Sequence, residues 1–217
     1  SKNNARLEPI PKADPETSGI DEFQEINFGN KQKTKGKIKF SGREASFEAG
    51  LARESSAESL KHLFIDFITR DVSVNNWQIG SLDLRDRVTK DLELPFEFSP
   101  KNNTITTTAG IGYKIPTPRR LAGVLEIKAD RVSSYFISQP ITITSEIYLK
   151  NIKAIGGEDL NCRLESPWIS ASRTLKRLPD QAQITDRILI LKPLISTKEI
   201  SSSKFMDFQQ KLVQCFK

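Results

Sequence analysis

The sequence predicts an α+β protein that is mainly β, built from antiparallel, sandwich-like sheets with one internal amphipathic helix and one C-terminal helix. Apolar and polar residues alternate in several short runs, which is typical of strands with one solvent-facing side. Only two segments space their apolar residues as a helix does. The composition, 37 % hydrophobic and 28 % charged, is that of a globular chain. We therefore expect a folded protein.

Residues 1–24 are predicted to be a linker or flexible tail, since Pro9, Pro11 and Pro15 accompany scattered charges and no apolar period. A β-hairpin is predicted next, with Gly42 in its turn. The apolar side chains that alternate along its two strands are Ile38, Phe40, Ala45, Phe47 and Ala49.

A helix is predicted over residues 55–69, because Ser55 and Glu58 have the spacing of a capping box and an apolar stripe follows at helical spacing. Extended character resumes at Val72 and continues, through a Leu92–Phe98 run of strict alternation, to Lys114. Residues 25–117 thus form a predicted β-rich subdomain.

The second predicted subdomain covers residues 118–217, because Pro116 and Pro118 interrupt regular structure between the two halves. Strands are predicted over 140–149, 168–175 and 183–191. The chain ends in a predicted helix, 203–216, in which Phe205, Phe208, Leu212 and Phe216 share one face.

The charge pattern gives no reason to expect a nucleic-acid partner. The formal net charge is +6, but 33 Lys and Arg are spread among 27 Asp and Glu, and the densest groups are only 31–37 and 119–120. No apolar run reaches the roughly 18 residues that span a bilayer, so we expect no membrane span. Because the chain begins at Ser1 rather than Met, we expect a trimmed or processed chain from which an upstream signal or domain was removed.

Catalytic chemistry is not indicated by the residues. The single histidine, His62, falls within a predicted helix, and a nucleophile–base pair has no obvious second member. One His and two separated Cys are too few for a closed zinc site. Glycine-rich phosphate loops are not found either. We therefore expect no catalytic residue, no cofactor and no metal.

Two sets of residues leave alternatives open. Cys162 and Cys215 either form a disulfide or lie apart as small buried side chains. Trp77, Tyr113 and Trp168 are the candidate ligand-contact aromatics, and the alternative is that they belong to the core.

The order of features over residues 36–216 resembles the C-terminal region of bacterial transglutaminase-like proteins, which have an N-terminal β domain, a transglutaminase-like core and a C-terminal β-rich domain. The matching segments are Gly36–Arg53 with its Ala52-Arg53 ending, Leu82–Phe96, Arg131–Pro140, Glu165–Arg173, Asp186-Arg187-Ile188 and Phe205–Gln209.

This resemblance implies a non-catalytic accessory or binding domain, because the family's Cys, His and Asp lie in a core that precedes the matched region. The implied partner is an upstream domain of the same polypeptide or a cell-envelope protein. The implied location is periplasmic or extracellular, with the cytoplasm as the alternative. A free-standing β-sandwich module that binds peptide, glycan or lipid is the alternative function.

Overall fold

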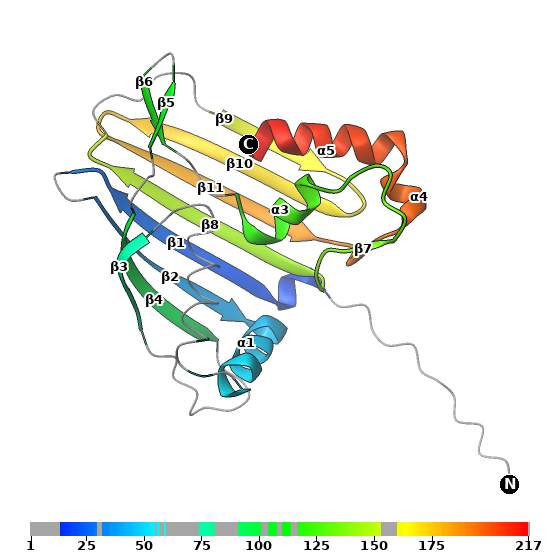
Figure 1. The fold of residues 1–217 in the computed structure, drawn as a ribbon, viewed down its shortest axis with the longest axis horizontal. Helices are drawn as coiled ribbons and strands as arrows, with labels where there is room; N and C mark the ends of the chain where they lie inside the picture. The colour runs from blue at the N-terminus through cyan, green and yellow to red at the C-terminus, as the bar shows by residue number, and fades with distance from the viewer. Residues whose placement is uncertain are drawn as a thin grey trace, which may run out of the picture.

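The computed structural model describes residues 14–29, 32–54, 56, 59, 74–80, 91–100, 104–107, 110–113, 117–152 and 160–216. Its fold is mainly β with a few helices, as predicted (Figure 1). The strands are β1 (Gly19–Asn27), β2 (Lys33–Ser41), β3 (Val74–Ile79), β4 (Leu92–Pro100), β5 (Thr104–Thr107), β6 (Gly110–Tyr113), β7 (Tyr135–Phe136), β8 (Ile141–Lys150), β9 (Leu160–Glu165), β10 (Ile169–Leu178), β11 (Gln181–Ile190) and β12 (Leu194–Ile195). The helices are the 3-10 turn η1 (Pro15–Thr17) and α1 (Gly42–Glu54), α3 (Arg119–Leu125), α4 (Thr197–Ile200) and α5 (Ser203–Phe216).

One eight-stranded sheet, in the order β3-β4-β2-β1-β8-β11-β10-β9, dominates the fold. Neighbouring strands are antiparallel except at the centre, where β1 and β8 run parallel in register from Gly19↔Thr142 to Asn27↔Lys150. Four of these strands precede residue 117 and four follow it, and most of β1 lies in the segment predicted as a tail. The parallel pair therefore joins both halves of the chain into a single sheet.

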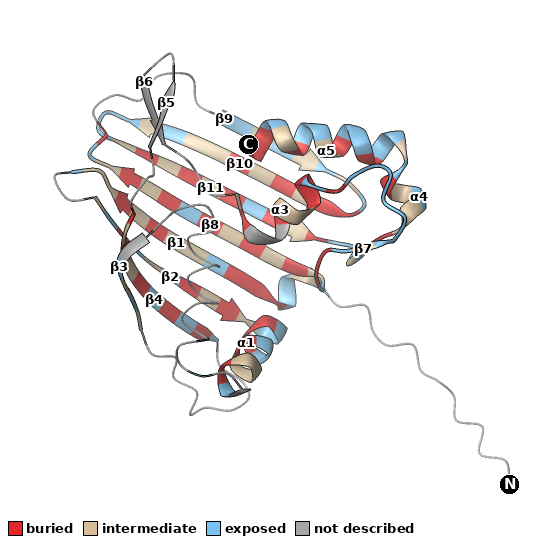
Figure 2. Ribbon diagram, in the orientation of Figure 1, coloured by how far each residue is buried: buried red, intermediate tan, exposed pale blue. Residues whose placement is uncertain are grey.

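The two faces of the sheet differ in polarity. Along β8, buried Ile141, Ile143 and Ile147 alternate with less buried polar residues, and Figure 2 shows the same alternation on neighbouring strands. Helices α3 and α5 lie over the apolar face (Figure 1). The described residues thus form one large sheet with helices on one side, where we predicted sandwich-like sheets. The alternation of apolar and polar residues along a strand predicts which side chains are buried. It does not predict whether helices or a second sheet cover them.

Residues 42–54 form helix α1, so the second strand of the predicted hairpin is wrong. Ala45, Glu48 and Ala52 are buried at helical spacing, whereas Phe47 is 57 % exposed. Ala45, Phe47 and Ala49 alternate over only five residues, which is too short a run to exclude a helix, and the packing of α1 selects the helical period. Gly42 begins the helix at a φ of 59°, a conformation that favours glycine.

Strand β1 begins at Gly19, inside the segment predicted as a tail. Its buried side is polar in the middle, with Glu22 and Gln24 between Ile20 and Ile26, so the apolar period is hidden. Residues 1–13 lie outside the described residues. So does the predicted helix 55–69, apart from Ser56 and Ser59.

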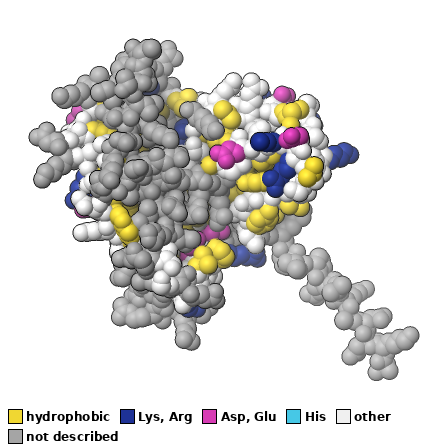
Figure 3. All heavy atoms as spheres, in the orientation of Figure 1, with side chains coloured by type: hydrophobic (Ala, Val, Ile, Leu, Met, Phe, Trp, Pro, Cys, Tyr) yellow, Lys and Arg dark blue, Asp and Glu magenta, His cyan; other side chains and the backbone are white. Residues whose placement is uncertain are grey.

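The second half follows its prediction closely. Strands β8, β10 and β11 lie where the alternation placed them, and α5 spans residues 203–216 as predicted. Phe205, Phe208, Leu212 and Phe216 are all buried on one face of α5. Over α3, α4 and α5, hydrophobic and charged side chains are interspersed on the surface (Figure 3).

A row of polar residues divides the apolar face into two clusters. Glu22, Ser145, Asp186 and Arg173 are direct register partners across β1, β8, β11 and β10. The larger cluster includes Ile20, Ala171, Ile143 and Ile188 on one side of this row, and the smaller includes Ile26, Leu149, Ile147 and Ile184 on the other. We call Glu22, Ser145, Asp186 and Arg173 the polar row.

Candidate binding surface

The face opposite the helices, here the polar face, is a lattice of ion pairs at the β4–β2–β1 end. The lysines of β2 alternate outward, and each pairs with an acid on a neighbouring strand or, for Lys39, immediately before one. The pairs are Lys33–Glu97 at 2.7 Å, Lys35–Glu25 at 3.2 Å, Lys37–Glu93 at 3.0 Å and Lys39–Asp91 at 2.7 Å. Exposed pairs of this kind stabilise little individually.

Glu25 is the centre of this lattice. Lys150 Nζ lies 2.6 Å from one carboxylate oxygen and Lys35 Nζ lies 3.2 Å from the other. The hydrogen bond from Lys150 lowers the pKa of Glu25, and burial opposes that effect only in part. The group therefore remains ionised and holds two cations beside the aromatic residues described next.

An aromatic pair interrupts the charges. The rings of Phe23 and Tyr148, from adjacent β1 and β8, have centroids 5.5 Å apart. The Tyr148 hydroxyl donates to Glu146 at 3.3 Å and accepts from the Gln183 amide at 3.0 Å. Burial, followed by the charge of Glu146, raises the pKa of Tyr148, so the phenol stays protonated at neutral pH.

A hollow of about 490 Å³ opens beside Phe23. Its apolar lining residues are Phe23 and Pro95, which face the polar side, and Phe96, which like its register partner Gly36 points to the apolar side. The charged and polar lining residues are Lys35, Lys37, Gln78 and Glu97. Its volume is within the range of ligand sites, and an apolar floor with a few polar groups is their usual composition.

Gly36 lies in the strand beneath this hollow, and by the alternation of β2 a side chain at this position would point to the apolar face. A Cβ at this position would lie 2.2 Å from the Phe23 carbonyl oxygen and 2.6 Å from the Phe96 ring. Since real Cβ atoms do not approach so closely, only glycine lets β1, β2 and the Phe96 ring come together here.

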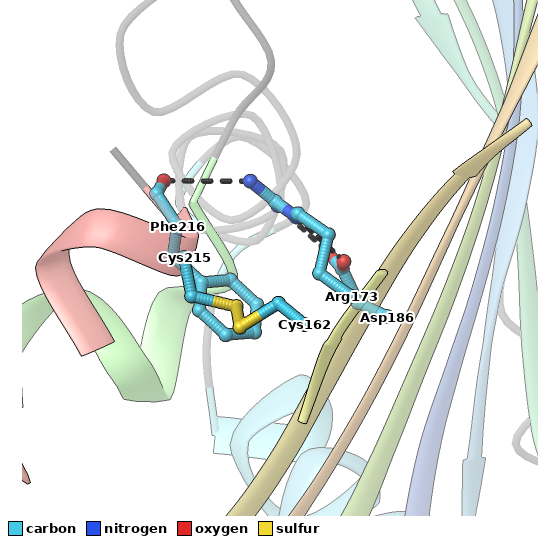
Figure 4. The surroundings of a disulfide bond; sticks show 5 residues. All are labelled: Cys162, Arg173, Asp186, Cys215 and Phe216. Carbon is cyan, nitrogen blue, oxygen red and sulfur yellow. Dashed lines mark hydrogen bonds and ion pairs between the residues drawn. A yellow bond between two sulfur atoms is a disulfide. The ribbon is translucent and has the colours of Figure 1, made fainter. Parts of the chain in front are cut away.

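The other concentrated set of polar contacts is buried and ties down the C-terminus (Figure 4). Arg173 donates to both carboxylate oxygens of Asp186, each at 2.7 Å, and to the Phe216 carbonyl at 3.4 Å. Its guanidinium also lies 4.6 Å from the centroid of the Phe216 ring. Cys162 and Cys215 form a disulfide next to it, which bonds β9 to the end of α5. We call this assembly the C-terminal anchor.

Trp168 lies in the core, which counts against a ligand-contact role for its ring. It is 4 % exposed and packs edge-on against Phe205, with ring centroids 5.3 Å apart. Its indole N–H donates to Glu199 at 3.0 Å. Glu199 also accepts a hydrogen bond from Lys192 Nζ at 2.6 Å and forms a capping box with Ser196. These contacts lower the pKa of Glu199 to about 2, and the hydrogen bond from Lys192 has the largest effect.

The remaining predicted site residues do not come together. Trp77 is partly buried and packs against the larger apolar cluster. Tyr113 lies in β6, and its side chain is not among those described; His62 is outside the described residues. Sequence reasoning missed Phe23 and Tyr148. The sequence did contain a signal for Tyr148. It alternates with the buried isoleucines of β8, so its side chain must point to the opposite face of the sheet.

Within the described ranges, no three His, Cys, Asp or Glu side chains gather as metal ligands. No helix in that part of the chain has the length and apolarity needed to cross a bilayer. Comparison with known proteins adds no relative, since no family model, no curated protein and no solved structure matches the chain.

Proposed function

We propose that this chain is a non-catalytic accessory module that engages another protein domain through its polar face. The observation that carries the proposal is the hollow beside Phe23, in which apolar lining residues are surrounded by paired charges. Such a surface suits a protruding apolar side chain with polar neighbours, which is the usual composition of a small protein contact.

The proposed partner is a transglutaminase-like domain upstream in the same polypeptide. The support is the resemblance of residues 36–216 to the region that follows such a core. A rigid sheet fits this role, because a preorganised surface loses little entropy on binding.

The experiment has two parts. The coding sequence upstream of Ser1 is read for a Cys-His-Asp core, and that core, produced separately, is titrated with this chain by calorimetry. We expect binding that Phe23→Ser weakens at least about tenfold, since the change removes the apolar centre of the hollow. Thr185→Ser, on the polar face but away from the hollow, is the matched control and should bind normally. The absence of an upstream core, or equal binding by both variants, would refute the proposal.

A glycan-binding role is the second candidate, and the Phe23–Tyr148 pair favours it. Sugars stack on half-exposed aromatic rings and accept hydrogen bonds from neighbouring amides, and here Gln183 and Glu146 flank the ring. A glycan array probed with the chain and with Tyr148→Ala tests this candidate. Binding lost in the variant supports it, and an empty array rejects it.

We also propose a periplasmic or extracellular location. The support is the Cys162–Cys215 bond, because disulfides persist in oxidising compartments. Alkylation of protein from fractionated cells, followed by mass spectrometry, should find both cysteines blocked from reaction. Free thiols in rapidly quenched cells would contradict this location.

A further inference from the structure

A second hollow, of about 430 Å³, lies between β9 and α5. Its apolar lining includes Leu164 of β9, Trp168 and Phe208 of α5. Arg163 and Glu165 line it as well. Three consecutive strand residues alternate in direction, so side chains of one face alone cannot account for the lining. Main-chain atoms of β9 therefore line the hollow together with side chains, and it is distinct from the hollow on the polar face.

Strand β9 is the last strand in the order of the main sheet. It pairs with β10 on one side, from Glu165↔Ser170 to Leu160↔Leu175. On its other side, no strand in the described part of the chain pairs with it. A sheet edge of this kind offers alternating N–H and C=O groups to an added extended segment.

The helix beside this edge is held in place by the C-terminal anchor. The disulfide fixes Cys215 of α5 to Cys162 of β9, and the Arg173 guanidinium binds the Phe216 carbonyl. Figure 1 shows α5 lying alongside β9. The width of the groove is therefore set before any ligand arrives, which limits the entropy lost on binding.

Three charged residues of α5 line the groove, Lys204, Asp207 and Lys211, and together with Arg163 and Glu165 they leave the lining with one positive charge in excess. Lys204 and Lys211 both line it and are both exposed, and neither lies in an ion pair with a described residue. They are two helical turns apart, about 10 Å. Arg163 already pairs with Glu165 at 3.2 Å, so the unpaired cations are those of the helix.

We propose that the groove between β9 and α5 binds an extended acidic peptide, which adds to the sheet as a strand beside β9. Its backbone pairs with the edge of β9. Alternate side chains point toward α5, where acidic groups meet Lys204 and Lys211 and apolar groups contact Leu164 and Phe208. The backbone pairing provides affinity, and the lysines select for acidic sequences.

The test uses the full chain and a fluorescently labelled eight-residue peptide that alternates glutamate and valine, capped at both ends, with binding followed by anisotropy. We expect saturable binding. Lys204→Glu with Lys211→Glu should weaken it about tenfold, because attraction becomes repulsion. The matched control is Lys176→Glu, which reverses an exposed lysine of β10 outside the groove and should leave affinity unchanged.

Two further peptides separate strand addition from simple charge attraction. A version N-methylated at every residue has no amide donor on either edge and should not bind. A version with lysine in place of glutamate should not bind either. Failure of the glutamate peptide to bind at millimolar protein, or equal binding of its N-methylated version, would overturn the proposal. Either result leaves the polar-face proposal standing, because Phe23 lies on a different surface.

Discussion

At the scale of single residues, the contact between Arg173 and Asp186 has the largest expected effect on stability. Both side chains are almost fully buried and two short hydrogen bonds join them. Burying an ion pair costs much of what its attraction returns, whereas leaving one partner alone is strongly unfavourable. The two residues are therefore expected to be tightly coupled.

Removing one partner should destabilise the protein far more than removing both. Asp186→Leu is expected to lower the free energy of unfolding by about 3–5 kcal/mol, because it leaves the Arg173 charge buried and unpaired. The double variant Arg173→Met with Asp186→Leu should recover most of that loss. Urea unfolding of the wild type, both single variants and the double variant measures the coupling. Additive effects would show that the pair does not act as a unit.

Glu199 should make stability depend on pH in the acidic range. Its folded-state pKa, about 2, is below its ordinary value of 4.5, so its contribution is fully present above pH 4.5 and is lost as pH falls toward 2. Glu199→Gln should cost about 1–2 kcal/mol at neutral pH and flatten the dependence between pH 4.5 and 2. Urea midpoints across this range test the expectation. Glu126→Gln, at an exposed position, is the control, and an equal flattening there would contradict the assignment.

At the scale of elements, glycine has opposite roles in β2 and α1. Gly36→Ala places a Cβ against the Phe23 carbonyl and the Phe96 ring and should cost at least about 2 kcal/mol. Gly50→Ala lies within α1, where a Cβ meets nothing within 4 Å, and should add about 0.5–1 kcal/mol through helix propensity. Thermal unfolding of both variants should show shifts of opposite sign. A stable Gly36→Ala protein would mean that β1 and β2 can separate without cost.

The disulfide links two elements that are distant in sequence. Cys162 and Cys215 are 53 residues apart, so reduction releases a large loop in the unfolded chain. We expect dithiothreitol to lower the free energy of unfolding by about 2–4 kcal/mol. The double variant Cys162→Ser with Cys215→Ser should be equally destabilised and insensitive to the reductant. A wild-type protein that reductant leaves unchanged would contradict a stabilising bond.

Elements were predicted well where one period dominated and poorly where two competed. Strands β8 and β11 alternate isoleucine with polar residues over ten positions, and α5 repeats large apolar residues over 14, so each pattern excludes the other. Helix α1 has only small apolar residues on its buried side and a phenylalanine on its exposed side. Local pattern could not reveal it, because its packing partners decide which face is inside.

The candidate binding surface was less predictable than the fold. Tyr148 and Phe23 are near neighbours because β1 pairs with β8, a contact between residues more than one hundred positions apart. The alternation of side chains along β8 is enough to place Tyr148 on the polar face. The partner strand, and with it the hollow beside Phe23, follows from topology that a single sequence does not encode in local pattern.

At the scale of the whole molecule, the sheet crosses the boundary between the two predicted subdomains. Strand β1 pairs with β8 over nine residues, so residues 118–217 alone would expose the edge of β8. We expect the full chain to unfold in one transition, with tryptophan fluorescence and far-ultraviolet circular dichroism coinciding. The fragment 118–217 should aggregate. Two separate transitions, or a stable monomeric fragment, would show that the halves are independent domains.

The polar row has a consequence for how the chain finds its alignment. A strand that slips by two residues keeps every apolar side chain on the correct face, so hydrophobic burial opposes such a slip only weakly. Across this sheet, however, a two-residue slip of β11 would place Asp186 opposite an apolar residue of β10 and leave Arg173 facing Ile184 or Ile188. The buried charges therefore favour the native register over registers shifted by two residues. In this way the polar row specifies the alignment of the four strands β1, β8, β11 and β10.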